Sequence, residues 1–501
     1  MNNYIIGLDI GTSGAKALGL THQGQVLFTS YEAYAPLSGI PGRFELDPEV
    51  LLQAVVKALA GVLHLAGDED QPVAVCFSCA MHSLIAVDAS GSPLTNVITW
   101  ADLRSGEQAE RMKNTQIGKR IYERTGTPIH PMSPLCKIMW LKENMPEVFA
   151  KTEKFISIKE YIWYKMFGLY QVDYSIASAT GLLDIFELSW CQDALQMAGI
   201  KESQLSELVA PTYARDGATC TYAPELKLPA EFRFVIGAND GCLANLGTNA
   251  VRPGDLAVTI GTSGAVRMIS GRAQFDPQGR IFNYILTEHC YVSGGAINNG
   301  GVVLRWFVEN FMEQPGLDPN DFSEIIKQAD EVEPGSGGLV FLPYLFGERA
   351  PVWDADARGV FFGIRSGHGK KHFMRAVLEG ITFSLYQIGL SLEETIGPSK
   401  VIYASGGFIR SHSWLQLLAD TFGKPVCITN AADASALGAA ILGLYATLSI
   451  SRLEDAEQLI KVQKIYQPDM QRHKIYMRNF EIYDVLYGKL KEEFKKIKDV
   501  S

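Results

Sequence analysis

Apolar and polar positions alternate along this chain in a way that predicts strands and helices in turn. Short apolar runs predict buried strands at residues 4–8, 72–78, 232–238, 256–260, 339–346 and 401–405. Stretches with one apolar helical face or with helix-capping residues predict helices after Asp47-Pro48 and over 160–167, 371–395 and 433–446. Because strands and helices alternate in both halves, the pattern predicts α/β domains.

Two helices at the end of the chain have distinctive patterns. The stretch 433–446 is rich in Ala and Gly, which suits close contact between helices. The tail has apolar residues on one helical face, while its Lys/Glu face is most simply solvated surface. The apolar residues of this expected tail face are Ile482, Leu486, Leu490, Phe494 and Ile497.

An internal repeat divides the chain. The hexamer IGTSGA occurs at Ile10–Ala15 and again at Ile260–Ala265, each time after a strand-like run. A chain of 501 residues is too long for one hydrophobic core, so two large domains are expected. A repeat of this length indicates a duplicated domain. We therefore place the domains at residues 1–248 and 249–501.

The repeated hexamer has the composition of a loop that binds phosphate. It supplies glycines for tight turns and hydroxyls beside free backbone N–H groups. The flanks differ, because Asp9 and Lys16 of the first copy correspond to Thr259 and Val266 of the second. The alternative is that both copies are ordinary glycine-rich turns. That alternative is weakened because the same hexamer recurs about half a chain further on. We interpret the copies as two facing hairpins, one per domain, that close on one polyphosphate.

Composition excludes several classes of partner. The net charge is −10, the sequence pI is about 5.5 and no basic stripe occurs, which argues against a nucleic-acid partner. The N-terminal residues do not resemble a signal peptide, and no apolar run has the length expected of a membrane span. Cys76 and Cys79 lie in an apolar run and are expected to be buried thiols rather than zinc ligands. We expect a cytoplasmic protein with no membrane or nucleic-acid partner.

A single acidic residue stands at a corner between a strand and a helix. The run 232–238 leads into Asn239-Asp240-Gly241, which places Asp240 at a helix start. A carboxylate there can act as a general base, or it can cap the helix. The residues alone leave both roles open.

Further segments resemble a known family. No G-x-x-x-x-G-K-S/T motif is present, so the hairpins must bind the phosphates, as in the ATPase fold shared by actin, heat-shock chaperones and sugar kinases. Residues 132–144 and 359–379 resemble the two signatures of the FGGY carbohydrate kinases. The resemblance implies two actin-like ATPase (ribonuclease H-like) domains with a cleft between them. The first domain would bind sugar and phosphate, and the second would bind the nucleotide.

The resemblance also implies roles for individual residues. Asp240 would be the catalytic base, and Asp9 and Asp240 would organise Mg²⁺, mainly through waters. The co-substrate would be ATP. The residues implied in nucleotide binding are Gly11, Thr12, Ser13, Lys16, Gly261, Thr262, Gly301, Arg305, Gly406, Gly407 and Ser411.

The substrate is implied by three segments. Met81 and His82 follow a strand where family members keep substrate contacts, although a core histidine is the alternative for His82. Residues 99–104 and 347–353 resemble the gluconate kinases of this family. Arg104 is a candidate partner for a sugar carboxylate, with a structural salt bridge as the alternative.

The resemblance implies phosphorylation of the terminal hydroxyl of a sugar acid, D-gluconate to 6-phosphogluconate. Xylulose or another pentulose is the alternative substrate. A non-catalytic, actin-like nucleotide switch is a second class of function, and a homodimer is compatible with either.

Overall fold

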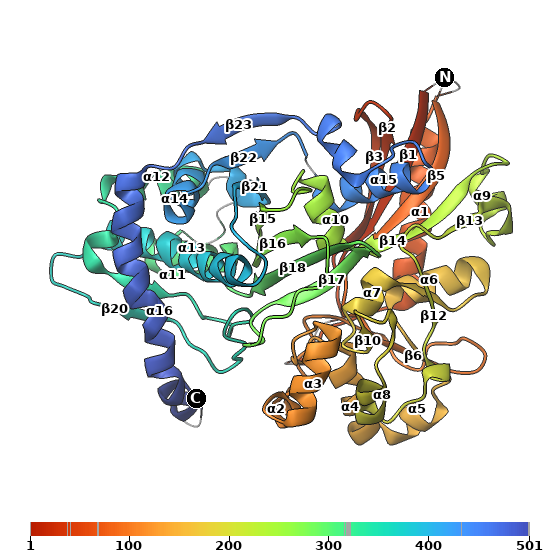
Figure 1. Ribbon diagram of the computed structural model, residues 1–501, viewed down its shortest axis with the longest axis horizontal. Helices are drawn as coiled ribbons and strands as arrows, with labels where there is room; N and C mark the ends of the chain where they lie inside the picture. Colours follow the sequence, from red (N-terminus) through yellow and green to blue (C-terminus); the bar gives the residue numbers. More distant parts are fainter. Residues whose placement is uncertain are drawn as a thin grey trace.

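The computed structural model describes residues 2–37, 39–40, 42–67, 70–314, 316, 322–431 and 433–498. Each half of the chain is built on one large sheet (Figure 1). The first sheet has the order β13 (Ala214–Asp216), β14 (Arg233–Asn239), β5 (Asp70–Cys79), β1 (Asn2–Ile10), β2 (Gly14–Thr21) and β3 (Val26–Ala33). The second has the order β17 (Phe282–Thr287), β18 (Cys290–Ile297), β16 (Gly264–Ser270), β15 (Asp255–Ile260), β21 (Val401–Ser405), β22 (Val426–Thr429) and β23 (Val462–Tyr466).

The two sheets share the same central arrangement. Strand β1 pairs antiparallel with β2 and parallel with β5, and β15 pairs antiparallel with β16 and parallel with β21. The hexamer repeat forms the turn between the two antiparallel strands in each sheet. The predicted duplication is therefore present in the topology.

The identical hexamers do not fold identically. In the first hairpin Ile10 pairs with Ala15, and the amide of Gly11 donates to Gly14 O at 3.0 Å. In the second Ile260 pairs with Gly264, and the amide of Gly261 donates to Ser263 O at 2.8 Å. The second turn is thus one residue tighter. Because side chains alternate along a strand, this shift changes which residues of β16 share a face with those of β15.

Helix α1 (Pro48–Leu65) begins as predicted. Asp47 caps it by accepting from the amides of Glu49 and Val50, and Pro48 occupies its first turn. By length and composition α1 could span a membrane, the one such helix among the described residues. One face of the helix, from Leu51 to Val62, is instead buried against the first sheet, next to β2 and β3. Its packing makes it a core helix.

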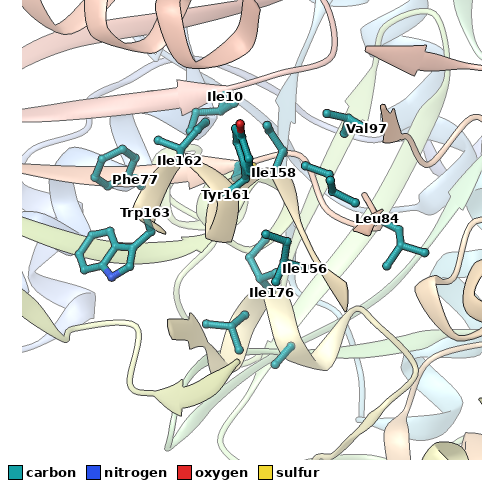
Figure 2. Close-up of a cluster of buried hydrophobic side chains, with 14 of the residues drawn as sticks. Ile10, Phe77, Leu84, Val97, Ile156, Ile158, Tyr161, Ile162, Trp163 and Ile176 are labelled. Atoms are coloured by element: carbon teal, nitrogen blue, oxygen red, sulfur yellow. The ribbon is translucent and has the colours of Figure 1, made fainter. Parts of the chain in front are cut away.

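A second lobe is inserted between β5 and β14. It holds the short strands β6 (Ile85–Val87) and β8 (Lys154–Ile156) and the helices α2 (Gly106–Lys113), α3 (Gln116–Thr125), α4 (Pro134–Asn144), α6 (Ile158–Phe167) and α8 (Gln192–Ala198). Figure 2 shows Tyr161, Ile162 and Trp163 of α6 packed beside Ile10 and Phe77 of the sheet. This buried cluster fixes the lobe to the strands that end at the hairpin.

Helix α15 (Ala434–Ala446) belongs to the second half of the sequence but packs on the first sheet, beside β1 and β5 (Figure 1). It also crosses α10 (Asp240–Gly247) with no side chain between the two backbones. A Cβ added at Gly438 would overlap the carbonyl of Leu243, and one at Gly7 would overlap that of Ala436. The expected close contact of this small-residue helix is therefore confirmed, with a strand as well as with a helix.

We expect Gly438→Ala to destabilise the protein by about 3 kcal/mol, because the added methyl group must displace backbone rather than a flexible side chain. Gly488→Ala in α16 (Met470–Lys498) is the matched control, since nothing lies within 4 Å of its added Cβ. There alanine should stabilise the helix by up to about 1 kcal/mol. Urea unfolding of both variants measures the difference. Equal effects at the two sites would contradict the close contact.

Two predictions about the second half need correction. The run 339–346 forms only a three-residue strand, β19 (Val340–Leu342), because the next residue, Pro343, has no backbone N–H with which to extend the pairing. Helix α16 is present, but Ile482 and Ile497 of the expected apolar face are 40% and 49% exposed. The aromatic residues Tyr476, Phe480 and Tyr483 are buried instead, along with Leu486 and Phe494. The hydroxyl of Tyr483 lies 2.6 Å from Ser384 Oγ and 3.1 Å from the hydroxyl of Tyr344. These hydrogen bonds satisfy the hydroxyl, so that the tyrosine can be buried in the core.

The remaining long helices of the second half are α11 (Gly301–Phe311), α13 (Lys370–Thr395) and α14 (His412–Phe422). All eight cysteines are free, and Cys76 and Cys79 are buried as expected.

Candidate active site

Both glycine-rich hairpins line one cavity of about 410 Å³ between the two sheets. The first contributes Gly11, Thr12 and Ser13, and the second contributes Gly261, Ser263 and Gly264. The same cavity is lined by Asp240, Met81 and His82. Backbone N–H groups and hydroxyls from both halves therefore face the same space as one carboxylate.

A second pocket, of about 250 Å³, adjoins the first at Gly261. Six residues expected at the nucleotide line it: Gly261, Thr262, Gly301, Arg305, Gly407 and Ser411. Gly406 lies just behind this wall with a φ of +97°, and an added Cβ would overlap Ile260 O, so only glycine fits. Ser411 uses its hydroxyl to cap α14 by accepting from Trp414 N at 3.3 Å.

Asp240 stands in the first turn of α10, where β14 ends. Asn239 is the cap of this helix, because its side-chain oxygen accepts from Cys242 N at 2.8 Å. Asp240 is thus free of the capping role that the sequence left open, and its carboxylate accepts from Gly241 N at 2.8 Å. Burial raises the pKa of Asp240, and the charge of Arg267 opposes this shift.

Asp9 lies at the end of β1, next to the first hairpin, and accepts from Ser78 Oγ at 2.6 Å. Burial, together with the charges of Asp240 and Asp433, raises the pKa of Asp9 to about 7. Carboxylates that disfavour one another's charge suit a cation placed between them. No group of three His, Cys, Asp or Glu side chains among the described residues could hold a metal ion. The donor set therefore fits a hard cation that keeps most of its waters.

Lys16 is not in either cavity wall. Its ammonium pairs with Asp433 at 2.5 Å, at the start of α15. The cation that the sequence assigns to phosphate is thus held beside the first hairpin by a carboxylate from the other half of the chain.

Met81 and His82 follow β5 and line the main cavity, but His82 is already bonded at both ring nitrogens. Nδ1 lies 2.7 Å from Ala179 O, and Nε2 lies 3.1 Å from the hydroxyl of Tyr284. With Nδ1–H donating to the carbonyl, Nε2 accepts from Tyr284. This is the satisfied histidine that the sequence kept as the alternative, and burial lowers its pKa to about 3, so the ring is neutral.

Arg104, predicted at the substrate, does not line the main cavity. Its Nε donates to both carboxylate oxygens of Asp102 at 3.0 Å, and its Nη2 donates to Glu45 at 2.5 Å. It also stacks on Trp140, 4.5 Å from the ring centroid. The salt bridge that the sequence kept as the alternative is therefore present, and a role at the substrate stays a prediction.

Residues 4–247 and 256–447 match the N-terminal and C-terminal domains of the FGGY family of carbohydrate kinases. The chain belongs to this family. It is 42% identical to a gluconokinase of Bacillus licheniformis over 99% of this chain and 98% of that one. It is 29% identical to a xylulose kinase of Bacillus subtilis over 98% of this chain and 97% of that one.

Solved structures agree on the fold of this FGGY kinase. A gluconate kinase from Lactobacillus acidophilus matches with a TM-score of 0.94 and 33% identity, covering 99% of this chain and all of that one. A xylulose kinase from the same organism matches with a TM-score of 0.93, again at 33% identity and with the same coverage. The two-domain, actin-like ATPase fold expected for FGGY kinases is present.

Sequence reasoning gave no role to several residues of the FGGY cleft, although Trp100, Arg349 and Trp353 lie in the segments 99–104 and 347–353 that it linked to the substrate. Arg267, Tyr284 and Arg349 line the main cavity, as do Trp100 and Trp353. Lys137 lies behind it, fully buried, and donates to the carbonyls of His82 at 2.5 Å and Thr99 at 2.7 Å. Lys137 and Arg267 are single charges within apolar runs, LCKIM and AVRMI, and that pattern was the available signal.

Proposed function

We propose that this protein is a gluconokinase, which uses ATP to phosphorylate the terminal hydroxyl of D-gluconate and forms 6-phosphogluconate. The observation that supports a kinase most strongly is the single cavity shared by both hairpins and Asp240. The choice of gluconate is supported by the 42% identity to a gluconokinase, against 29% to a xylulose kinase.

In the proposed reaction, Asp240 accepts the proton of the sugar hydroxyl as its oxygen attacks the γ-phosphoryl group. The bond between the γ-phosphorus and the oxygen bridging it to the β-phosphate breaks, and ADP leaves. The hairpin amides and hydroxyls of Gly11–Ser13 and Gly261–Gly264 hold the phosphates, and the pocket at Gly407 and Ser411 takes the nucleoside. Asp9 and Asp240 would hold Mg²⁺ through waters; when bound, it neutralises charge on the β- and γ-phosphates.

The test is ADP release measured with purified protein, ATP and Mg²⁺ over a panel of D-gluconate, D-xylulose, D-ribulose and glycerol. We expect gluconate to give a kcat/KM about 10²-fold above that of the other substrates. A preference for xylulose would overturn the choice of substrate. ADP release that does not depend on any sugar would instead support the nucleotide switch. The cytoplasmic location and the homodimer stay predictions.

A further inference from the structure

Two arginines in the main cavity have no established role and unused hydrogen-bond donors. Nε and Nη1 of Arg267 and Nε of Arg349 are shielded from solvent and have no hydrogen-bond partner among the described residues. A buried donor without an acceptor costs free energy in the empty protein, and a buried guanidinium costs more. Such groups indicate a ligand that is not present.

The charges around the cavity come from two arginines and two carboxyl groups. Of the described residues that line the cavity, Asp240 is the one carboxylate, against two guanidiniums. His82 is neutral. The charge of Arg267 acts on both Asp240 and Arg349. Glu348, buried beside Arg349, also acts on that arginine, so the two guanidiniums are matched by two carboxyl groups. The feature that points to an acid is therefore the set of unpartnered donors, for which a substrate carboxylate would supply acceptors.

The tight turn of the second hairpin places Arg267 in the cavity. Arg267 pairs with Ala257 on β15 and Gly294 on β18, so it shares a face with Thr259, Ala265 and Ala296, which all line the cavity. If β15 and β16 had the register of the first hairpin, Arg267 would pair with Val258. Its side chain would then lie on the same face as Val258, which is buried in the core. Gly294 leaves room for the arginine stem, because an added Cβ would lie 3.0 Å from Arg267 Cγ.

Arg267 is also displaced from the phosphates. It lies four residues beyond Ser263, which is about 13 Å of strand. The guanidinium of Arg349 is oriented by two contacts: Nη2 donates to Ile297 O at 3.0 Å, and the group lies 5.1 Å from the ring centroid of Trp100. Both arginines thus lie at the substrate side of the cavity, beside Tyr284.

We propose that Arg267 and Arg349 together bind the carboxylate of the sugar acid, so that they set the preference for an acid over a neutral sugar. Arg267 offers unpartnered donors of a planar guanidinium, the group suited to a carboxylate, and Arg349 adds its Nε. This inference rests on the proposed function, because it identifies which side chains recognise the acid group of its substrate.

The test compares D-gluconate with D-glucitol, which has the same carbon chain but a neutral CH₂OH in place of the carboxylate. For wild type, Arg267→Gln and Arg349→Gln, we would measure ADP release and the Kd of each compound from tryptophan fluorescence, since Trp100 and Trp353 line the cavity. We expect each variant to lower the gluconate-to-glucitol ratio of affinities about 10²-fold, mainly through weaker gluconate binding. Arg267→Lys should retain part of the preference.

The ratio removes effects that both compounds share. Loss of Arg267 also changes the environment of Asp240, but that change slows both substrates alike. Arg104→Gln is the matched control, because it removes a guanidinium that is already paired outside the cavity, and its ratio should equal that of wild type. A ratio within about two-fold of wild type in either test variant would overturn the inference. If the wild-type protein neither bound gluconate nor released ADP in its presence, the proposed function itself would be contradicted.

Discussion

Asp240→Asn is expected to lower kcat with gluconate about 10³-fold and to leave the affinity for ATP nearly unchanged. The amide has the shape of the carboxylate but cannot accept the proton of the attacking hydroxyl. Because Asn239 caps α10, the change should leave the helix start intact. Single-turnover kinetics, with ATP binding measured separately, would show the effect. Asp484→Asn, at an exposed position of α16, is the control.

The pH profile gives a second test of the same residue. Only the ionised form of Asp240 can act as the base, and burial raises its pKa above the ordinary 3.8. In wild type, kcat/KM should therefore fall as the pH drops through this raised pKa and recover above it. The acidic limb should be absent from the residual activity of Asp240→Asn. Near-normal turnover, or an unchanged acidic limb, would show that another group is the base.

Asp9→Asn is expected to lower kcat/KM for ATP about 10²-fold and, in the absence of Mg²⁺, to raise the thermal stability of the protein. The activity falls because an amide orients metal-bound waters less well than a carboxylate. The stability rises because Asp9 is a carboxyl whose pKa is raised to about 7 by burial and by the charges of Asp240 and Asp433. At neutral pH and above, the folded protein must keep an unfavourable charge that asparagine lacks.

The sign of the pH dependence follows from that shift. A carboxyl whose pKa is raised on folding adds stability at low pH and loses it as the pH rises through the folded value. The difference in Tm between Asp9→Asn and wild type should therefore grow from pH 4 to pH 8, with Mg²⁺ removed by chelator. Adding Mg²⁺ and ATP should stabilise wild type more than the variant. A variant that is less stable than wild type at pH 8 would contradict this account.

The parts of the fold that sequence predicts well are those determined by neighbours along the chain. The cap at Asp47 and the strand Val401–Ser405 follow from local composition, and the structure has both where expected. The repeated hexamer likewise gave the positions of both hairpins. Asp240, which directly follows a predicted strand, lines the same cavity as they do. These features need no knowledge of what packs against them.

Other features depend on contacts between distant residues and were missed for that reason. Nothing within IGTSGA distinguishes the two registers, yet the tighter second turn decides that Arg267 points into the cavity. Arg104 resembles a substrate residue in the sequence, but in the structure it pairs with Glu45 and Asp102. In α16, Tyr483 is buried whereas its neighbour Ile482 is exposed, because the Tyr483 hydroxyl has buried hydrogen-bond partners. Hydrophobicity alone would have favoured burial of Ile482.

The path of α15 has a consequence for the independence of the two halves. Its residues cover apolar side chains of the first sheet, among them Ile5, Leu20 and Cys76. A polypeptide that stopped at Gly247 would present that surface to water and would be prone to self-association. Although the halves repeat one plan, the first half depends on a helix from the second to cover its sheet, so we expect it to be poorly soluble when it is expressed alone.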